Sequence, residues 1–172
     1  MWIISTLQYM KRSVYSYLLF LALPLLAFAR LGETEQQLTG RFGAAVWRGK
    51  EITLTQGKIV EFGSTLRFRQ GDWTITSVII DGRCAREVYQ KSGDWTEDQF
   101  ITVLTSNAQG TRWTDVSDGS IRKLAREWRR EDGATAGWQM GGAMTVTHPA
   151  YRRAKENAEA KAKADAARIP KI

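Results

Sequence analysis

The residue types that most often carry out catalysis are scarce in this chain of 172 residues. His148 is the only histidine and Cys84 is the only cysteine. A single cysteine excludes an internal disulfide, and one residue of each type excludes metal sites built from several Cys or several His ligands. A histidine base also needs a nucleophile and an orienting partner, and neither is recognisable for His148. We therefore predict a protein that is not an enzyme and that holds no metal and no cofactor, with His148 at the boundary of a C-terminal helix.

The acidic residues do not form a recognisable site either. The stretch Asp115-Val116-Ser117-Asp118-Gly119-Ser120 resembles part of a calcium loop, but it lacks the third ligand position and the distal Glu of an EF-hand. Asp, Ser and Gly are ordinary turn residues, which favours a surface loop. Glu131 and Asp132 are adjacent, so on a strand they would face opposite sides and could not cooperate as acid and base.

Aromatic and basic residues are interleaved between positions 112 and 138, a pattern that can stack against sugars or bases. The alternative is that the tryptophans fill the core, because each large aromatic side chain buries much apolar surface. Tryptophans exposed together would favour carbohydrate or peptidoglycan binding. The candidate binding surface comprises Arg126, Trp128, Arg129, Arg130, Trp113 and Trp138.

Residues 1–29 have the layout of a secretory signal peptide. Lys11 and Arg12 precede an apolar stretch from 18 to 29, and Ala27-Phe28-Ala29 fits cleavage before Arg30. This stretch is shorter than the roughly 20 residues of a spanning helix, which favours cleavage over an uncleaved anchor. Because Met10 directly precedes the two basic residues, we predict translation from Met10. The sequence thus predicts a periplasmic or secreted protein with no transmembrane helix after cleavage.

The formal net charge of +7 is unevenly distributed along the chain. Two positive charges belong to residues 1–29, the segment 30–147 carries +1, and the segment 148–172 carries +4. A nearly neutral body argues against nucleic acid as a partner. We expect the basic tail to contact anionic polymers or lipids through Arg152, Arg153, Lys155, Lys161 and Lys163.

Hydrophobic patterning predicts an α+β domain over residues 30–147. Thr34 with Gln37 forms a capping box for a helix that ends near Gly43, and a second helix covers 95–107, capped by Asp94 or Thr96. The expected architecture is an antiparallel sheet, made of a meander plus a hairpin, with one or two short helices covering one face. Its strands are expected at 58–62, 65–70, 73–80, 83–90, from about 127 onward, 135–140 and 143–147.

The turn at Asp81-Gly82 gives the most specific prediction of register. A two-residue turn places Ile79 opposite Cys84 and Ile75 opposite Val88. Strand alternation then assigns Thr74, Thr76, Arg83 and Glu87 to a second face that is half solvated. Cys84 is expected to be buried as a small hydrophobe; the alternative is an exposed thiol that pairs with another chain.

The tail, residues 148–172, is predicted to be helical from Pro149 to Ala167 because it is rich in Ala, Lys and Glu. Beyond Tyr151 its only apolar residues before Ile169 are alanines, so it has little surface to bury. We expect it to project into solvent or to fray.

The segment Gly32-x-Thr34-x-x-Gln37-Leu38-x-x-x-Phe42-Gly43 is similar to the first helix of SmpA/OmlA (BamE-type) envelope proteins. The whole layout also resembles a loose set of exported bacterial proteins of unknown function: a signal, this first helix, a meander, a helix ending in Asn, Trp-Arg-Arg-x-Asp-Gly and an Ala/Lys tail. The resemblance implies a location in the cell envelope and no activity.

These observations favour an exported non-catalytic binding or envelope-associated module. Its partner would be an envelope protein, a cell-wall polymer or an anionic lipid surface, met by the second face of the sheet, the segment 126–130 or the tail. The alternative function is a secreted inhibitor or a carbohydrate- or peptidoglycan-binding protein that uses exposed tryptophans.

Overall fold

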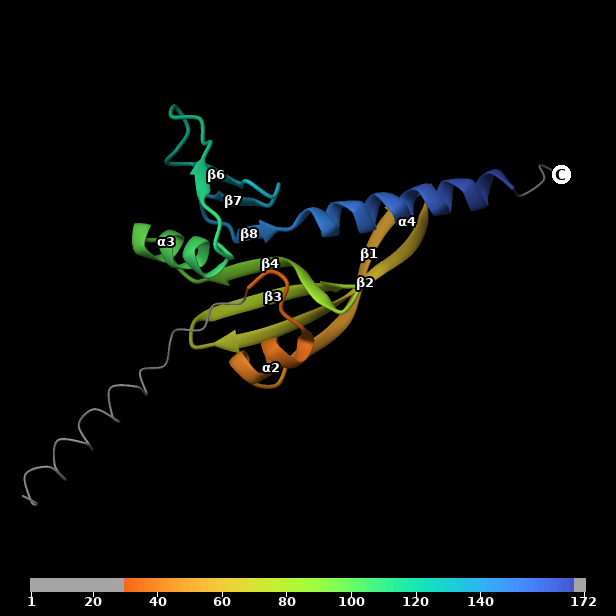
Figure 1. Cartoon of the computed structure of the whole chain (residues 1–172), viewed down its shortest axis with the longest axis horizontal. Coiled ribbons are helices and arrows are strands. Elements are labelled where there is room, and N and C mark those ends of the chain that lie inside the picture. Colours follow the sequence, from red (N-terminus) through yellow and green to blue (C-terminus); the bar gives the residue numbers. More distant parts are fainter. Residues whose placement is uncertain (1–29, 169–172) are drawn as a thin grey trace, which may run out of the picture.

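A computed structural model describes residues 30–168 of the chain. The predicted signal peptide, its start at Met10 and its cleavage before Arg30 concern residues outside this range, as do residues 169–172 of the tail. Within the described range the chain forms one eight-stranded antiparallel sheet and three helices (Figure 1). The predicted α+β class with an antiparallel sheet is confirmed.

The sheet joins the predicted meander and the predicted hairpin side by side. Its strand order is β1-β2-β3-β4-β8-β7-β6-β5, so that β8, the last strand in the sequence, lies at the centre next to β4. The strands are β1 (Trp47–Thr55), β2 (Lys58–Gln70), β3 (Trp73–Ile80), β4 (Arg83–Lys91), β5 (Trp113–Asp115), β6 (Ala125–Arg130), β7 (Thr135–Gln139) and β8 (Met144–Thr147).

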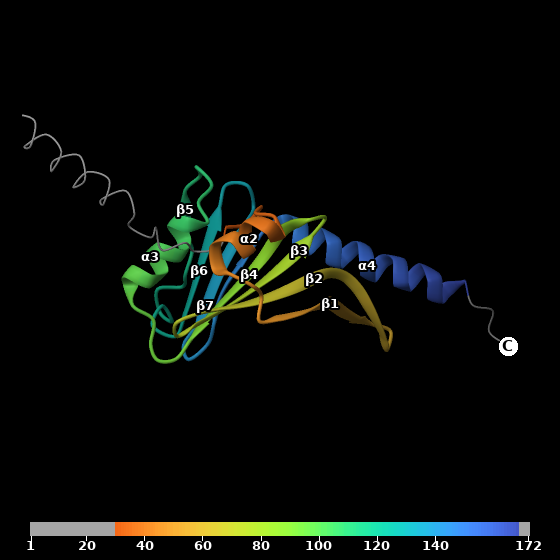
Figure 2. The same ribbon diagram turned by 90° about the horizontal axis from the view of Figure 1, so that it is seen from below.

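Two short helices cover one face of the sheet, as predicted (Figures 1 and 2). In α2 (Glu35–Phe42) and α3 (Glu97–Ser106) both capping boxes form, with Thr34 and Thr96 as the N-cap residues. Gly43 ends α2 at a φ of 80°, a left-handed value that glycine adopts without strain. The main core lies between these helices and the sheet, and its largest buried side chains include Tyr89, Phe68, Leu38, Leu66, Met144 and Val103.

The C-terminal helix α4 (Pro149–Ala167) lies across the other face of β1–β4, where it contacts all four strands. Figure 1 shows α4 and α2 on opposite sides of these strands. The expectation that the tail helix projects into solvent is therefore wrong for most of its length. Tyr151 packs on Phe62, and the partly buried Ala154, Ala158 and Ala162 continue the same stripe. Alanines leave little to bury, but they allow a helix to lie close to a sheet.

The first strand was not expected from the sequence. β1 pairs with β2 over the full length of β1, and β2 is one strand instead of two separate ones. The register shifts between Glu51 and Ile52, at a bulge that involves Phe62 and Gly63 of β2. This irregularity interrupts the alternation of apolar and polar residues, which explains why the sequence pattern suggested a break near Gly63.

A second bulge corrects the predicted register of β3 and β4. Ile79 does face Cys84, but Ile75 pairs with Tyr89 instead of Val88 because the register shifts between Val78 and Ile79. The extra residue on β4 is Ala85. Beyond Ala85 every side chain of β4 faces the opposite side from the one that simple alternation assigns. Glu87, predicted on the half-solvated face, is consequently fully buried in the main core.

The second half of the sheet follows the prediction more closely. β7 and β8 form a hairpin that turns at Gly141-Gly142, and β6 begins two residues before the expected Glu127. The short edge strand β5 was not expected. No helix of the described range 30–168 is both long enough and apolar enough to span a membrane.

Candidate functional site

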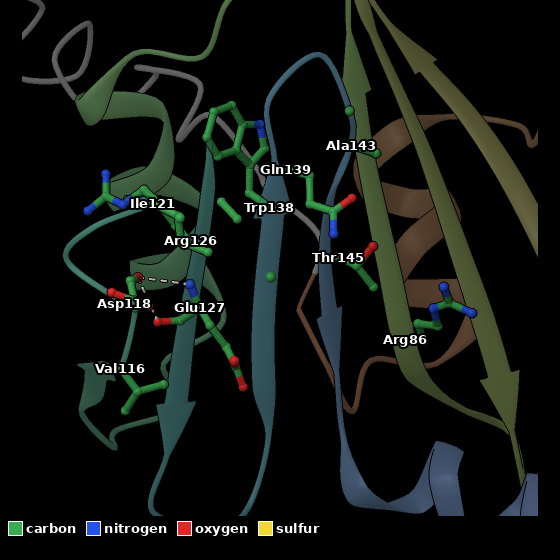
Figure 3. A pocket seen from close by; sticks show the side chains of 14 residues that line it. Arg86, Val116, Asp118, Ile121, Arg126, Glu127, Trp138, Gln139, Ala143 and Thr145 are labelled. Atoms are coloured by element: carbon green, nitrogen blue, oxygen red, sulfur yellow. Dashed lines mark hydrogen bonds between the residues drawn. The ribbon is translucent and has the colours of Figure 1, made fainter. Parts of the chain in front are cut away.

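A groove of about 690 Å³ opens on the same sheet face as α4, over the strands that α4 does not cover. The groove lies over β6, β7 and β8 and is bounded by the loop that joins β5 to β6. Figure 3 shows its two sides: Val116, Asp118 and Ile121 line one side, Glu127 lies in the middle, and Gln139, Thr145 and Arg86 follow toward β4.

The floor of the groove consists of small residues. Ala125, Gly137 and Ala143 belong to β6, β7 and the turn before β8. A Cβ atom added at Gly137 would meet nothing within 4 Å. Glycine weakens the interior of a strand, and it often marks a place where a ligand approaches the backbone closely. The position of Gly137 at the centre of the floor fits that role.

The loop wall is held in shape by its own side chains. Asp118 accepts hydrogen bonds from the backbone N–H and the hydroxyl of Ser120, which lower the pKa of its carboxyl. Ser117 Oγ accepts a 2.9 Å hydrogen bond from the backbone N–H of Glu127, which ties the loop to β6. These contacts hold Val116 and Ile121 at the rim, where both remain exposed. The stretch that resembles a calcium loop is thus a folded wall in which Asp115 pairs with Arg122 and Arg126.

Arg86 closes the end of the groove nearest α4. Its guanidinium donates a 2.9 Å hydrogen bond to the hydroxyl of Tyr151 and lies 5.0 Å from the centre of that ring. Tyr151 in turn donates to Glu51. About one third of the Arg86 side chain is exposed, and its guanidinium also lies 3.8 Å from Glu51. The groove thus has a basic group at one end, the acidic Asp118 at the other and Glu127 between them.

Of the candidate surface predicted from the sequence, Arg126, Trp128 and Trp138 point mainly to the opposite face, into the core. Trp128 is buried against Phe100, and Trp138 packs edge-on to the same ring. The guanidinium of Arg126 lies 5.0 Å from the Phe100 ring centre and pairs with Glu97 at 2.5 Å. The groove is therefore lined by the strands of these residues, while their side chains stabilise the packing of α3.

Arg130, Trp113 and Arg129 have separate environments. Arg130 is buried, pairs with Asp132 and stacks over Trp113, whose ring N–H donates to the carbonyl of Leu104. Arg129 is exposed and pairs with Glu127. The predicted site residues thus do not form one contact surface. Among the tryptophans of the described range only Trp47, which the prediction did not include, is classed as exposed, at 45%.

The predicted tail contacts are all on the solvent side of α4. Arg152 donates to the carbonyl of Gly133, and Lys155 pairs with Glu159. Arg153, Lys161 and Lys163 are exposed, and within residues 30–168 they make no ion pair. They remain available to an anionic partner.

His148 occupies the predicted helix boundary, where its Nδ1 accepts a hydrogen bond from the backbone N–H of Ala150 as the N-cap of α4. Its Nε2 lies 3.8 Å from Asp132. Burial lowers the pKa of this imidazole, with Asp132 opposing and Arg130 reinforcing the effect. Nδ1 is therefore engaged in capping, which leaves His148 poorly placed to act as a base through that atom.

A buried polar cluster beneath α3 was missed by the sequence reasoning. Glu87 accepts a 2.5 Å hydrogen bond from the hydroxyl of Tyr89, and that hydroxyl accepts one from the side-chain amide of Asn107. The side-chain oxygen Oδ1 of Asn107 accepts a hydrogen bond from the backbone N–H of Leu31. Burial raises the pKa of Glu87 to about 7, although its hydrogen bonds oppose the shift. The cluster links β4, the end of α3 and the start of the described chain.

Cys84 borders this cluster and is 2% exposed, which confirms the predicted burial. Burial and the neighbouring Glu87 carboxylate raise the pKa of its thiol well above the usual value. We expect a disulfide thiol reagent to modify the native protein at least about 100-fold more slowly than the urea-unfolded protein, because the thiol must first be exposed by opening of the structure. Modification of the native protein within seconds would contradict this burial.

No protein-family model, curated protein or solved structure matches this chain. The resemblance of residues 32–43 to SmpA/OmlA proteins therefore stays a prediction.

Proposed function

We propose that the protein is an exported, non-catalytic binding module of the cell envelope, and that its ligand lies in the groove over β6–β8. The observation that carries this proposal is the groove itself, which has a floor of small residues on the β6–β8 part of the sheet face, beyond the strands that α4 covers. The rim offers the apolar Val116 and Ile121, and the lining also offers polar groups such as Gln139 and Thr145. This combination suits a chain with both apolar and hydrogen-bonding groups, such as an extended peptide or a glycan strand. Of the two contact surfaces predicted on the body, the second face of the sheet is favoured over the segment 126–130.

The absence of a catalytic set in the groove supports a binding role over an enzymatic one. Of its ionisable side chains, Arg86 pairs with Glu51, Arg126 pairs with Glu97 and Asp115, and Glu127 pairs with Arg129. Asp118 accepts hydrogen bonds from Ser120. The inhibitor or carbohydrate-binding alternative relied on tryptophans exposed together. Trp128 is buried and Trp113 and Trp138 are partly buried, so this alternative gains no support.

Filling the floor tests the proposal. Gly137→Val adds a β-branched side chain to open space in a strand, so we expect the free energy of unfolding to rise by about 0.5–1 kcal/mol. We expect the affinity for the envelope component that the wild-type protein captures to fall at least about tenfold, because the added side chain occupies the space of the ligand. The measurement is co-sedimentation of residues 30–172 with cell-wall sacculi and pull-down against detergent-solubilised envelope proteins.

Thr135→Val is the control, since it introduces the same residue type on the same strand, outside the groove lining and without adding bulk. It should leave binding unchanged. Equal binding by wild type and Gly137→Val would contradict the assignment of the groove, whatever the ligand is.

The contribution of the tail should be tested by charge reversal instead of truncation. Removing α4 would uncover Val78, Ile80 and Ala85, which pack beneath its first turns. If such a truncated chain lost binding, the loss could come from a disturbed fold as well as from the missing positive charges. Arg153→Glu with Lys163→Glu changes exposed charges only.

A further inference from the structure

The middle of the groove is one end of a row of paired residues that crosses the sheet. Glu127, Gly137 and Thr145 are direct neighbours on β6, β7 and β8, and all three line the groove (Figure 3). The pairing continues without a break to the edge strand β1, through Val88, Thr76, Arg67 and Trp47. We call these seven residues the cross-strand row. Six spacings of about 4.8 Å between neighbouring strands give the row a length of about 29 Å.

The side chains of the cross-strand row lie on the face that carries α4, but beyond the helix. Phe68 and Tyr89 point into the main core, so alternation along the strands places Arg67 and Val88 on the opposite face. The residues that pack beneath α4 on this face are further along the strands and include Val78, Ile80 and Ala85. Every member of the row is exposed or partly exposed. The row is therefore open to a ligand over its whole length.

Trp47 gives the β1 end of the row an aromatic surface. Its side chain is 45% exposed, and its ring folds back along the strand over Gly49. A Cβ atom at Gly49 would overlap the ring, so the glycine provides the space in which the ring lies. The guanidinium of Arg67 is 5.1 Å from the ring centre. An aromatic ring held in this way on an open face can stack against the apolar face of a sugar ring.

The β2 part of this face is basic. Arg67 and Arg69 are exposed, and within residues 30–168 neither forms an ion pair. They are two residues apart on one strand, so both side chains project from the same face. Arg69 also lines a hollow of about 400 Å³, whose other charged side chains are Lys91 and Asp72. Guanidinium groups without a partner bind carboxylates through paired hydrogen bonds, which favours a ligand that carries carboxylate groups here.

The backbone of the sheet is not available to a ligand that follows the row. Every strand of the row except β1 has a paired strand on both sides. Peptides that bind to sheets commonly add as a strand at an edge, where backbone groups are unpaired. A ligand that crosses the face meets side chains instead, and the polar ones are Thr76, Thr145, Arg67 and Glu127. Sugar hydroxyls can bond to all of these, because a hydroxyl both donates and accepts.

We propose that the ligand is a glycan strand that carries carboxylate groups, as an uncross-linked peptidoglycan strand does, and that it lies along the cross-strand row from the groove to Trp47. A sugar ring stacks on Trp47, carboxylates of the strand pair with Arg67 and Arg69, and hydroxyl groups donate to Glu127. This inference rests on the proposed function, to which it adds the chemical class of the ligand and its path beyond the groove.

Titration calorimetry of residues 30–172 with soluble, uncross-linked peptidoglycan strands tests the inference. We expect Trp47→Ala, and separately Arg67→Gln with Arg69→Gln, to lower the affinity at least about tenfold, because each change removes groups that contact the ligand. Chitohexaose has sugars without carboxylates, and polyglutamate has carboxylates without sugars. Each should bind at least about tenfold more weakly than the strands. The changed residues are exposed, so the thermal unfolding midpoints should stay close to that of the wild type.

Matched controls lie outside the cross-strand row. Arg48→Gln with Arg112→Gln removes two charges from exposed arginines, as the double variant on β2 does. Val46→Ala changes the residue next to Trp47, which is 62% exposed. Both controls should leave the affinity for the strands within about twofold of the wild type.

The inference is overturned if Trp47→Ala or the double variant on β2 binds the strands like the wild type, or if chitohexaose or polyglutamate binds as tightly as the strands. It is equally overturned if the wild type does not bind the strands, or if sedimentation finds a dimer that Trp47→Ala dissociates. Gly137→Val tests the groove separately. If Gly137→Val lowers binding to an envelope component and Trp47→Ala does not, the groove assignment stands and the inference fails.

Discussion

Replacing Arg130 by alanine is expected to lower the free energy of unfolding by about 3 kcal/mol. The Arg130 side chain has no solvent exposure, and its Nε and Nη2 donate to the two carboxylate oxygens of Asp132 at 2.9 and 2.6 Å. It also donates to the backbone carbonyl of Asn107 and to the side chain of Gln109. Alanine would leave these acceptors without their donor and the Trp113 ring without its cover. Urea unfolding at pH 7 measures the change.

Arg129→Ala is the control for Arg130→Ala, because Arg129 is the next residue on β6 but its side chain is 67% exposed. We expect a loss below about 0.5 kcal/mol for this control. Arg130→Lys should rescue only part of the stability, since an ammonium group cannot donate in the same forked geometry. A similar effect for Arg129→Ala and Arg130→Ala would contradict the structural role given to Arg130.

The pH dependence of the Arg130 contact has a defined sign. The hydrogen bonds from Arg130 lower the pKa of Asp132 from 3.8 to about 2. A carboxyl with a lowered pKa stabilises the native state above its unfolded value, and this contribution is lost as the pH falls through the folded value. The difference in stability between wild type and Arg130→Ala should therefore shrink as the pH falls from about 4 toward 2.

Glu87→Gln should act in the opposite direction and stabilise the protein at alkaline pH. Because Glu87 is buried and its pKa is raised from 4.5 to about 7, the native state favours the protonated form. Its contribution is complete below about pH 4.5 and is lost as the pH rises through about 7. At pH 8 the neutral amide should raise the free energy of unfolding by about 3 kcal/mol relative to wild type, and at pH 4 the two proteins should be nearly equal. The glutamine oxygen can still accept the hydrogen bond of Tyr89.

The measurement is a series of denaturant unfolding curves from pH 4 to pH 8 for wild type and Glu87→Gln. Glu61→Gln serves as the control because Glu61 is exposed on β2 and pairs only with Lys50. The control should follow the wild type within about 0.5 kcal/mol at every pH. A wild-type and Glu87→Gln difference that does not change with pH would show that the pKa of Glu87 is the same in the native and unfolded states, which would contradict the raised native pKa.

Local signals in the sequence predicted the elements of the fold better than their assembly. The capping residues Thr34 and Thr96 and the Asp81-Gly82 turn act through neighbours within a few residues, and each forms as expected. Bulges leave no such signal. Ala85 fits a strand as well as any neighbour does, yet it reverses the side to which Glu87 points.

The candidate site was predicted less well, because the partners of its residues lie far away in the sequence. Arg126 reaches Glu97 on α3, and Tyr151 reaches Glu51 on β1, contacts that only the folded sheet brings together. The interleaving of Trp and Arg between positions 112 and 138 correctly indicated that tryptophan and arginine side chains contact one another. It could not show that most of these side chains face the core. Gly137 within a predicted strand was the one sequence signal that could have pointed to the groove.

The central place of β8 affects how the chain folds. β1–β4 pair between neighbours in the sequence, whereas the seam between β4 and β8 joins Arg86–Tyr89 to residues about sixty positions later. Long-range strand pairing is slow because the intervening loop must close first. A chain that becomes free to fold in order from its N-terminus would thus hold two incomplete sheets until Met144–Thr147 arrives. The groove, which spans this seam from Arg86 to Glu127, can form only after β8 has paired with β4.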